Sequence, residues 1–374
     1  RRSTSELLGK VMAIDYFGSL VASLVFPLVL LPQLGLMRGA YLVGALNVLV
    51  AVLVLLQVRT PRKILWAATA AVVALVGMFA AANRIERSVE ALTYNDPVVY
   101  YQQTAYQKVV LTDYQDDLRM YLNGQLQFSS LDEARYHETL SASAMTSVKD
   151  PAHVLVLGGG DGLLAREILR YPSVKDVTIV DIDPGVTELA RSNRLLKDLN
   201  KASLSDPRVN VVNDDAFTYV RDSRATYDVV LVDLVDPSNE KLAKLYSTEF
   251  YRNVEARLAP EGVMVTQATS TFFSPHAFST VASTVATSQP DRQILPFSTN
   301  IPSFGEWGFV LSTRTPQNLI SQPLPEGLTY QDRETLEFIM RTKPARTETM
   351  EPSTLLHPRI VEVYNRDMRQ WRYY

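Results

Sequence analysis

Acidic residues follow four apolar, β-rich runs in the second half of the chain, and these residues are the best placed for chemistry. Asp161 lies in the turn after the first run, and Asp181 ends the second. Asp214 follows the third run, and Asp233 and Asp236 follow the fourth. Because the carboxyl ends of parallel strands meet at one edge of a sheet, the spacing predicts a cup of carboxylates there. Each Asp taken singly also suits a turn or a helix cap.

A carboxylate cup favours a cationic co-substrate and can remove a proton from an attacking amine. Free alkylamines have pKa values near 10.4 and are almost fully protonated at pH 7, whereas only the neutral amine attacks carbon. A carboxylate beside the nitrogen can act as general base, an effect of about 10²–10⁴-fold. If the leaving group is a neutral thioether, no general acid is needed, and in-line positioning supplies the remaining rate enhancement.

A glycine-rich turn beside these acids predicts a nucleoside site. The apolar run 154–157 leads into GGGDG, and 163–169 continues with helical periodicity. Glycine lets the backbone approach a ligand closely, and amides at a helix start favour electron-rich atoms. Gly158, Gly160 and Gly162 give G-x-G-x-G, whereas the dinucleotide fingerprint needs a glycine one position later. This pattern is typical of folds that bind S-adenosylmethionine, and a tight turn that binds nothing is the alternative.

Three of the acids suit the two ends of a nucleoside. Asp181 lies about twenty residues past the glycine turn, where a carboxylate can accept both ribose hydroxyls. Asp214 and Asp215 follow the third run, and an Asp at this position can accept a hydrogen bond from an adenine amino group. The sequence therefore predicts that the second and third strand ends bind the nucleoside.

The elements that position these groups alternate between strand and helix patterns. The runs VLVLG, VTIVDID, VNVVNDD, YDVVLVDL and GVMVTQA are separated by helical stretches, which predicts an α/β fold with a Rossmann-like parallel sheet and crossovers. The β-rich segment 96–130 with its Asn-Gly turn predicts a small antiparallel sheet. A helix is expected to start near Ser130 and to carry Tyr136 and His137.

Composition excludes several kinds of site. The chain has no cysteine, which excludes disulfides, thiolate nucleophiles and cysteine metal ligands. Its four histidines lack the spacing of metal ligands, so we predict no metal. The net charge of -3 argues against a nucleic-acid partner, which would require a basic excess.

Three apolar runs near the start of the chain predict transmembrane helices at about 11–36, 40–58 and 64–82. Each run contains 19 or more consecutive uncharged residues, enough to cross about 30 Å of hydrocarbon at 1.5 Å per residue. The alternative, three buried helices of a soluble domain, requires polar faces that these runs lack. Pro27 and Pro32 are expected to bend or end the first span. The lipid bilayer is therefore a predicted partner.

The orientation of these spans is ambiguous. Lys and Arg precede the first span, separate the second from the third and follow the third, so strict counting puts the region after the third span outside. Because helices absent upstream would also contribute, we give the count little weight. We expect a multi-pass protein of the inner membrane with its catalytic domain on the cytoplasmic side.

Changes in composition indicate four regions. We expect transmembrane helices in 1–90, a small antiparallel β domain in 91–140, a Rossmann-like catalytic domain in 141–345 and a C-terminal tail in 346–374. The basic end of that tail, 366–372, is interpreted as a solvated face rather than a binding site.

Four motifs together resemble the spermidine synthase family of polyamine aminopropyltransferases: GGGDG, VDID, NDDA and DLVDP. The surrounding TAYQKVV, NGQLQFSSLDEARYHETL, KLYSTEFY and PSFGEWGFVL extend the resemblance over roughly Tyr94–Leu311. With spans in front, the chain is similar to the membrane-anchored branch of that family. The resemblance implies transfer of the aminopropyl group of decarboxylated S-adenosylmethionine to a putrescine- or spermidine-class amine, leaving methylthioadenosine. It implies no prosthetic group, and soluble relatives suggest a homodimer.

The resemblance also implies a role for each matching residue. Asp233 is the proposed base, Asp236 its partner in the loop that closes over the substrates, and Asp161 helps bind the aminopropyl end. Asp181 contacts the ribose and Asp214 the adenine. Further substrate contacts are implied for Gln107, Tyr136, His137, Tyr246 and Trp307. The last two form aromatic walls of the amine tunnel, where a ring face can attract an alkylammonium, and plain core is the alternative for both.

The chain departs from the family pattern after the fourth predicted strand. Soluble members typically continue as D-S-x-D-P-x-G-P, whereas DLVDPSNEKLAKLYS lacks the later glycine and proline, so we expect a differently shaped gate. As a hypothesis, Glu306 near the tunnel favours a longer or more charged amine. Two alternatives stay open: a small-molecule methyltransferase using S-adenosylmethionine, whose carboxylate Asp161 should repel, and a non-catalytic membrane protein that binds polyamine or nucleoside.

Overall fold

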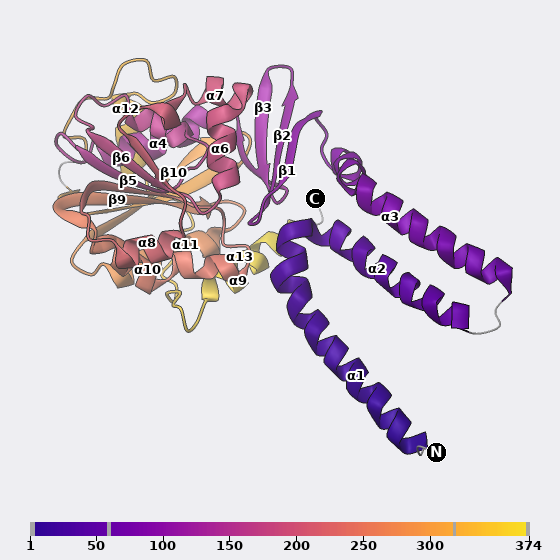
Figure 1. The fold of residues 1–374 in the computed structure, drawn as a ribbon. Helices are drawn as coiled ribbons and strands as arrows, with labels where there is room; N and C mark the ends of the chain where they lie inside the picture. Colours follow the sequence, from indigo (N-terminus) through magenta and orange to yellow (C-terminus); the bar gives the residue numbers. More distant parts are fainter. Residues whose placement is uncertain (1–3, 58–60, 317–318, 372–374) are drawn as a thin grey trace. The chain divides into compact units, whose positions relative to one another are not determined.

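The computed structural model describes residues 4–57, 61–316 and 319–371. Its chain divides into two compact units, Arg1–Ala105 and Tyr106–Tyr374. The first unit consists of long apolar helices and one strand. Its elements are α1 (Thr4–Val25), the π-helix η1 (Phe26–Leu30), α2 (Leu31–Gln57), α3 (Arg62–Ala91) and β1 (Val98–Gln103) (Figure 1).

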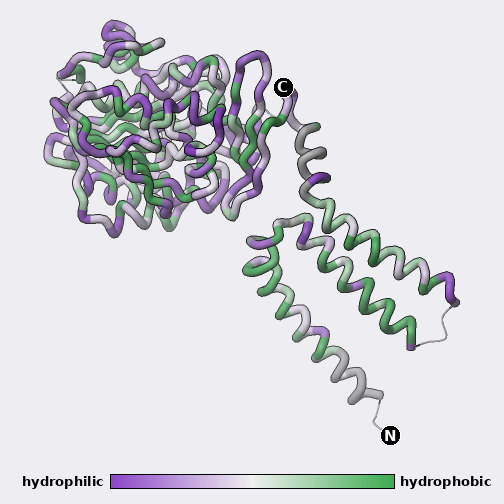
Figure 2. Tube along the Cα trace, turned by 45° about the horizontal axis from the view of Figure 1, so that its top comes forward, coloured by the Kyte–Doolittle hydropathy of each residue, from purple (hydrophilic) through white to green (hydrophobic). Residues whose placement is uncertain are grey.

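Three stretches of these helices are long and apolar enough to cross a membrane: Met12–Leu30, Met37–Gln57 and Arg62–Ala82. Almost none of their residues is buried within this unit, and hydrophobic residues dominate all three (Figure 2). An exposed apolar surface of this extent is typical of a segment that contacts lipid or another protein. Position 58, the predicted end of the second span, lies outside the described residues.

The first predicted span is interrupted rather than continuous. The α-helix ends at Val25, and Pro27 lies in the π-helix that follows, as expected for a residue that lacks a backbone donor. Gly35 then adopts φ 75° and ψ 172°, which are not helical angles. The candidate span therefore ends at Leu30 instead of residue 36.

The second unit begins with an antiparallel sheet of β2 (Lys108–Tyr114), β3 (Asp117–Leu122) and β4 (Gln125–Ser129). The turn between β3 and β4 is the predicted Asn-Gly turn. Asn123 has φ 52° and Gly124 has φ 82°, and two positive φ angles match the twist of a tight hairpin.

A seven-stranded sheet follows, in the order β10-β11-β9-β8-β5-β6-β7. Its strands are β5 (His153–Gly158), β6 (Asp176–Val180), β7 (Val209–Val212), β8 (Tyr227–Asp233), β9 (Leu258–Ser270), β10 (Gln293–Ile301) and β11 (Gly305–Thr313). β7, β6, β5, β8 and β9 are parallel, which confirms the predicted Rossmann-like fold. The antiparallel pair β10 and β11 was not predicted.

Helices cover both faces of this sheet, with α4, α6, α7 and α12 towards one face and α8, α10, α11 and α13 towards the other (Figure 1). The predicted helix near Ser130 is confirmed and begins at Glu133. The helices are α4 (Glu133–Met145), α5 (Leu163–Ile168), α6 (Pro184–Ser192), α7 (Arg194–Leu199), η2 (Ser203–Ser205), α8 (Ala216–Asp222), α9 (Glu240–Ala243), η3 (Lys244–Tyr246), α10 (Thr248–Glu255), α11 (Pro275–Ser288), α12 (Arg333–Arg341) and α13 (Arg359–Arg369).

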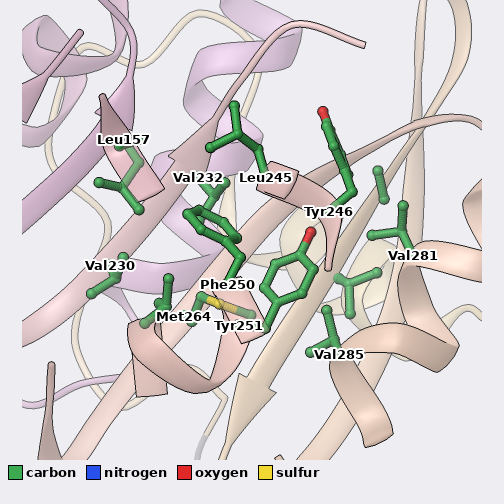
Figure 3. Close-up of a cluster of buried hydrophobic side chains, with 14 of the residues drawn as sticks. Leu157, Val230, Val232, Leu245, Tyr246, Phe250, Tyr251, Met264, Val281 and Val285 are labelled. Carbon is green, nitrogen blue, oxygen red and sulfur yellow. The ribbon is translucent and has the colours of Figure 1, made fainter. Parts of the chain in front are cut away.

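The main hydrophobic core fixes the register of the strands that end at the site. Val230 and Val232 of β8 pack in one cluster with Phe250 and Tyr251 of α10 and Val281 of α11 (Figure 3). All five side chains are almost fully buried, and burial of each large apolar side chain stabilises the fold by about 1.5–3 kcal/mol. The resulting register pairs the end of β5 with the end of β8.

Candidate active site

A cavity of about 880 Å³ lies at the carboxyl ends of the parallel strands. Its wall is acidic, with few basic groups. Asp161, Asp233 and Asp236 all face this one cavity, as the predicted carboxylate cup requires. The predicted site residues that line it are Gln107, Tyr136, His137, Gly158, Gly160, Asp161, Asp181, Asp215, Asp233, Asp236 and Trp307.

The glycine turn brings two strand ends into close approach. Gly158 has φ 88° and lies opposite Asp233, and a Cβ there would lie 2.0 Å from the carbonyl oxygen of Asp233. A Cβ on Gly160 would lie 2.4 Å from Oδ2 of Asp181. Because the first contact is with backbone, the turn tolerates no side chain at Gly158, whereas a side chain at Gly160 would require Asp181 to move.

Asp181 is held by backbone amides of the same edge. Its Oδ2 accepts from the amide of Gly160 at 3.1 Å, and its Oδ1 accepts from the amide of Asp183 at 2.8 Å. Burial raises the pKa of Asp181 to about 6, against the opposing effect of these amides. Gln107 donates from Nε2 to Asp183 Oδ2 at 3.0 Å, so this predicted contact residue is oriented by Asp183.

Asp233 is positioned by α4. The hydroxyl of Tyr136 donates to Asp233 Oδ1 at 2.5 Å, and the Tyr136 side chain is buried. Burial and the negative charge of Asp161 raise the pKa of Asp233 to about 6, although the charge of His137 and the Tyr136 hydrogen bond act in the opposite direction. The carboxyl is therefore poised to exchange a proton near neutral pH.

His137 belongs to a buried network behind Asp233. Its Nδ1 lies 2.8 Å from Oε2 of Glu133, and the same oxygen accepts from Arg166 at 2.8 Å. Burial lowers the pKa of His137, but the hydrogen bond and charge of Glu133 outweigh that effect, so the net pKa is raised. The raised pKa favours the cationic form of His137, and its charge acts to lower the pKa values of Asp161 and Asp233.

A second carboxylate fastens α4 from its outer side. Glu138 is 1% exposed and accepts four hydrogen bonds of 2.8–2.9 Å, from the amides of Thr329, Tyr330 and Gln331 and from the Thr329 hydroxyl. The segment after β11 is thereby fixed to the helix that carries Tyr136.

Asp161 and Asp236 flank Asp233 and differ in their partners. Asp161 Oδ1 accepts from the amide of Leu163 at 2.8 Å, and burial raises the Asp161 pKa. Asp236 Oδ2 accepts from the hydroxyl of Tyr364 at 2.9 Å. Its Oδ1 is buried and has no hydrogen-bond partner within the described residues. Burial raises the pKa of Asp236 to about 6, while the Tyr364 hydrogen bond lowers it.

Three predicted residues do not line the cavity. Gly162, with φ 81°, begins α5, and a Cβ there would meet Ser203 Oγ at 2.8 Å, so its role is in packing. Asp214 is exposed and accepts from the amide of Asp215 at 2.7 Å. Of the two adjacent acids only Asp215 faces the cavity, and its Oδ2 pairs with Lys244 at 2.6 Å.

Tyr246 is the third, and it is part of the core instead of the tunnel wall. It is 1% exposed and lies in the hydrophobic cluster (Figure 3). Its hydroxyl donates to the carbonyl of Val235 at 2.9 Å, so it fixes the loop before Asp236 from below. Glu306, expected near the tunnel, accepts from Ser298 at 2.6 Å and does not line the cavity.

Sequence reasoning missed several lining residues. Gln267 donates from Nε2 to the carbonyl of Leu234 at 2.5 Å and to the Tyr246 hydroxyl at 2.6 Å. A glutamine within the apolar run of β9 was a signal that could have identified it. No pattern in the tail pointed to Tyr364 or Met368, which also line the cavity.

These features define an α/β enzyme class in which a nucleoside turn of a Rossmann-like sheet faces an acidic cavity suited to a cation. The family described as "Spermine/spermidine synthase domain" matches residues 133–322. The chain belongs to the polyamine aminopropyltransferase family and is an aminopropyltransferase.

Individual relatives agree with this assignment. Polyamine aminopropyltransferase 1 of Streptomyces coelicolor is 40% identical over 389 residues, covering 100% of this chain and 72% of the relative. The polyamine aminopropyltransferase of Mycobacterium tuberculosis is 41% identical, with 97% and 70% covered. A solved spermidine synthase in complex with the transition-state analogue AdoDATO has a TM-score of 0.61 at 25% identity, covering 66% of this chain and 85% of its own. The Thermotoga maritima spermidine synthase shares the fold, with a TM-score of 0.59 at 24% identity and 66% and 84% covered.

Proposed function

We propose that this chain is a membrane-anchored enzyme that transfers the aminopropyl group of decarboxylated S-adenosylmethionine to a di- or polyamine. The observation that carries the proposal is the convergence of Asp161, Asp233 and Asp236 on the cavity that the glycine turn also faces. The AdoDATO complex of the related spermidine synthase supports the choice of co-substrate.

In this proposal the nucleoside binds against the glycine turn. Asp181, fixed by two amides, accepts the ribose hydroxyls, and Asp215 is the acid nearest the adenine end, in place of Asp214. The aminopropyl ammonium lies beside Asp161, since a carboxylate attracts a cation and would repel the carboxylate of intact S-adenosylmethionine.

The chemical step is a single displacement at carbon. The nitrogen lone pair of the acceptor forms a C–N bond to the aminopropyl methylene next to sulfur, while the C–S bond breaks and its electron pair neutralises the sulfonium. Methylthioadenosine leaves as a neutral thioether. The proton lost by the attacking nitrogen goes to Asp233, whose Oδ1 is held by Tyr136, so that Oδ2 is the accepting atom. Positioning and one base then provide the catalysis.

Membrane anchoring is the second part of the proposal. Three stretches meet the length and hydropathy of spans, and the Streptomyces relative aligns over 100% of this chain, apolar helices included. We place the catalytic unit on the cytoplasmic side. Extraction of the expressed protein by detergent, but not by alkaline carbonate, is the expected result, and protease should reach the catalytic unit only after cells are opened. Release by carbonate alone would contradict anchoring. A homodimer, suggested by soluble relatives, is tested by the mass of the detergent-solubilised particle.

The transfer reaction itself is tested with the purified chain, decarboxylated or intact S-adenosylmethionine, and putrescine or spermidine. We expect the products methylthioadenosine and an aminopropylated amine to form only with decarboxylated S-adenosylmethionine. Asp233→Asn should lower kcat by about 10²–10⁴-fold and leave nucleoside affinity nearly unchanged. Methyl transfer from intact S-adenosylmethionine would support the methyltransferase alternative instead, and binding without any product would support a non-catalytic role.

Asp176→Asn is the matched control for Asp233→Asn. Asp176 begins β6 and pairs with His153 at 2.6 Å on the exposed surface. Asp176 lies outside the cavity lining, so the kcat of the Asp176→Asn variant should match that of the unmodified chain.

A further inference from the structure

The last helix of the chain forms part of the cavity wall. Tyr364 and Met368 of α13 line the cavity together with the strand ends. The matched synthase domain ends at residue 322, well before this helix. The wall is therefore built by chain beyond the matched domain, from a region whose basic end the sequence patterns interpret as solvated.

Arg366 and Arg369 are exposed, as that interpretation expects, whereas Asp367 and Met368 between them face the protein. Asp367 is 2% exposed, and its carboxylate accepts from the amides of His276 and Ala277 at 2.9 and 3.1 Å and pairs with His276 Nδ1 at 2.8 Å. These amides begin α11, where a carboxylate satisfies donors that the helix leaves free. α13 is thereby fixed to the start of α11.

Further contacts join α13 to both rims of the cavity. Trp371, just after the helix, donates from Nε1 to the carbonyl of Phe273 at 2.9 Å, and the two rings pack edge to face at 5.1 Å. Asn365 donates to the carbonyl of Ser238 at 3.3 Å, in the loop after β8. This is the loop that lacks the glycine and proline of the soluble pattern, so α13 lies against the segment where this chain departs from it.

Tyr364 contacts the acid of that loop directly. Its hydroxyl donates to Asp236 Oδ2, and Asp236 Oδ1 remains buried without a partner among the described residues. A buried carboxylate oxygen without a partner is unfavourable, and an ammonium group entering the cavity would satisfy it. A phenol that holds one oxygen orients the other, because the carboxylate can then no longer rotate freely.

We propose that α13 is the specificity wall of the amine site: Tyr364 is a positioning residue that orients Asp236 towards the acceptor's ammonium group, and Met368 limits the acceptor's length. This inference rests on the proposed aminopropyl transfer and assigns part of its acceptor selectivity to the C-terminal helix. Met368 suits such a role because its unbranched thioether fills apolar space beside an alkyl chain.

Tyr364→Phe tests the positioning role because it keeps the ring and removes only the hydroxyl. We expect the KM for the amine to rise about tenfold, the magnitude of one charge-assisted hydrogen bond, with unchanged KM for the nucleoside. Met368→Ala should shift the ratio of kcat/KM for spermidine over putrescine towards spermidine by about tenfold. Tyr219→Phe is the control: it removes the hydroxyl that contacts Tyr227 at 2.7 Å, away from the cavity, and should change neither value.

Calorimetric titration of putrescine and spermidine into each variant separates this inference from the proposed function. If the chain transfers no aminopropyl group but Tyr364→Phe binds amines more weakly, the specificity role of α13 is supported and the transfer reaction is contradicted. If the chain is active and neither substitution changes its KM for the amine or its preference between amines, the specificity role of α13 is contradicted while the transfer reaction stands. Equal losses for nucleoside and amine, with a lowered unfolding midpoint, would also overturn the specificity role, because they indicate a purely structural helix.

Discussion

The two sides of the cavity hold their acids in different ways. On the nucleoside side, Asp161 and Asp181 accept hydrogen bonds from backbone amides of their own or the neighbouring β–α turn, at most 21 residues away along the chain. On the amine side, Asp233 and Asp236 accept from tyrosine hydroxyls that are 97 and 128 residues away. The nucleoside side is therefore encoded locally, whereas the amine side depends on how distant helices pack.

The largest effect should come from a substitution in the glycine turn on the nucleoside side. Gly160→Ala places a methyl group 2.4 Å from Asp181 Oδ2, so Asp181 must turn away from the amide that holds it. We expect nucleoside affinity to fall about 100-fold, the loss of roughly two hydrogen bonds to a charged group, with amine affinity unchanged. Isothermal titration with methylthioadenosine and with spermidine measures both. Equal losses on the two sides would contradict their independence.

A smaller effect should follow from removing the hydrogen bond between Tyr136 of α4 and Asp233 on the amine side. Tyr136→Phe removes a hydrogen bond that favours the ionised form of Asp233, so the Asp233 pKa should rise above its value of about 6. The acidic limb of the pH profile of kcat/KM should move to higher pH by about one unit, so that activity at pH 6 should fall about fivefold and activity at pH 7.5 by less than about twofold. The nucleoside KM should not change. An unshifted acidic limb would show that Tyr136 does not tune the base.

The smallest effect concerns stability of the empty protein. The pKa of Asp236 is about 6 in the fold, above the usual 3.9. Its ionised form therefore destabilises the fold above pH 6, and this cost disappears below pH 4, where the group is neutral in both states. Asp236→Asn should raise the free energy of unfolding at pH 7.5 by about 1 kcal/mol, since a buried amide without partners offsets part of the gain. Denaturant midpoints at pH 4 and 7.5 measure it, and a gain independent of pH would contradict the assigned cause.

The same contrast explains what the sequence could predict. The five parallel strands and the glycine turn follow from apolar runs and local turn chemistry, and both are present. The sequence could not show which of Asp214 and Asp215 faces the cavity, because the two are adjacent acids and only the folded backbone decides which way each side chain points. Here Asp215 also caps α8, and its side chain accepts from the amide of Thr218.

The amine side was predicted less completely for the same reason. Tyr246 has the aromatic character of a tunnel wall, yet packing places its ring in the core and its hydroxyl under the loop. Tyr364 has no local signal, because its role arises only when α13 packs against the start of α11. The antiparallel strands β10 and β11 were also not predicted.

The raised pKa values of Asp233 and Asp236 have a consequence for ligand uptake. Near pH 6 the unliganded enzyme carries protons on these groups part of the time, and a polyamine, already a cation, must displace them. Acceptor affinity should weaken in mildly acidic solution, and the heat of association should vary with the ionisation enthalpy of the buffer. Acceptor concentration and the pH around the active site would then jointly set the fraction of the enzyme that holds an acceptor.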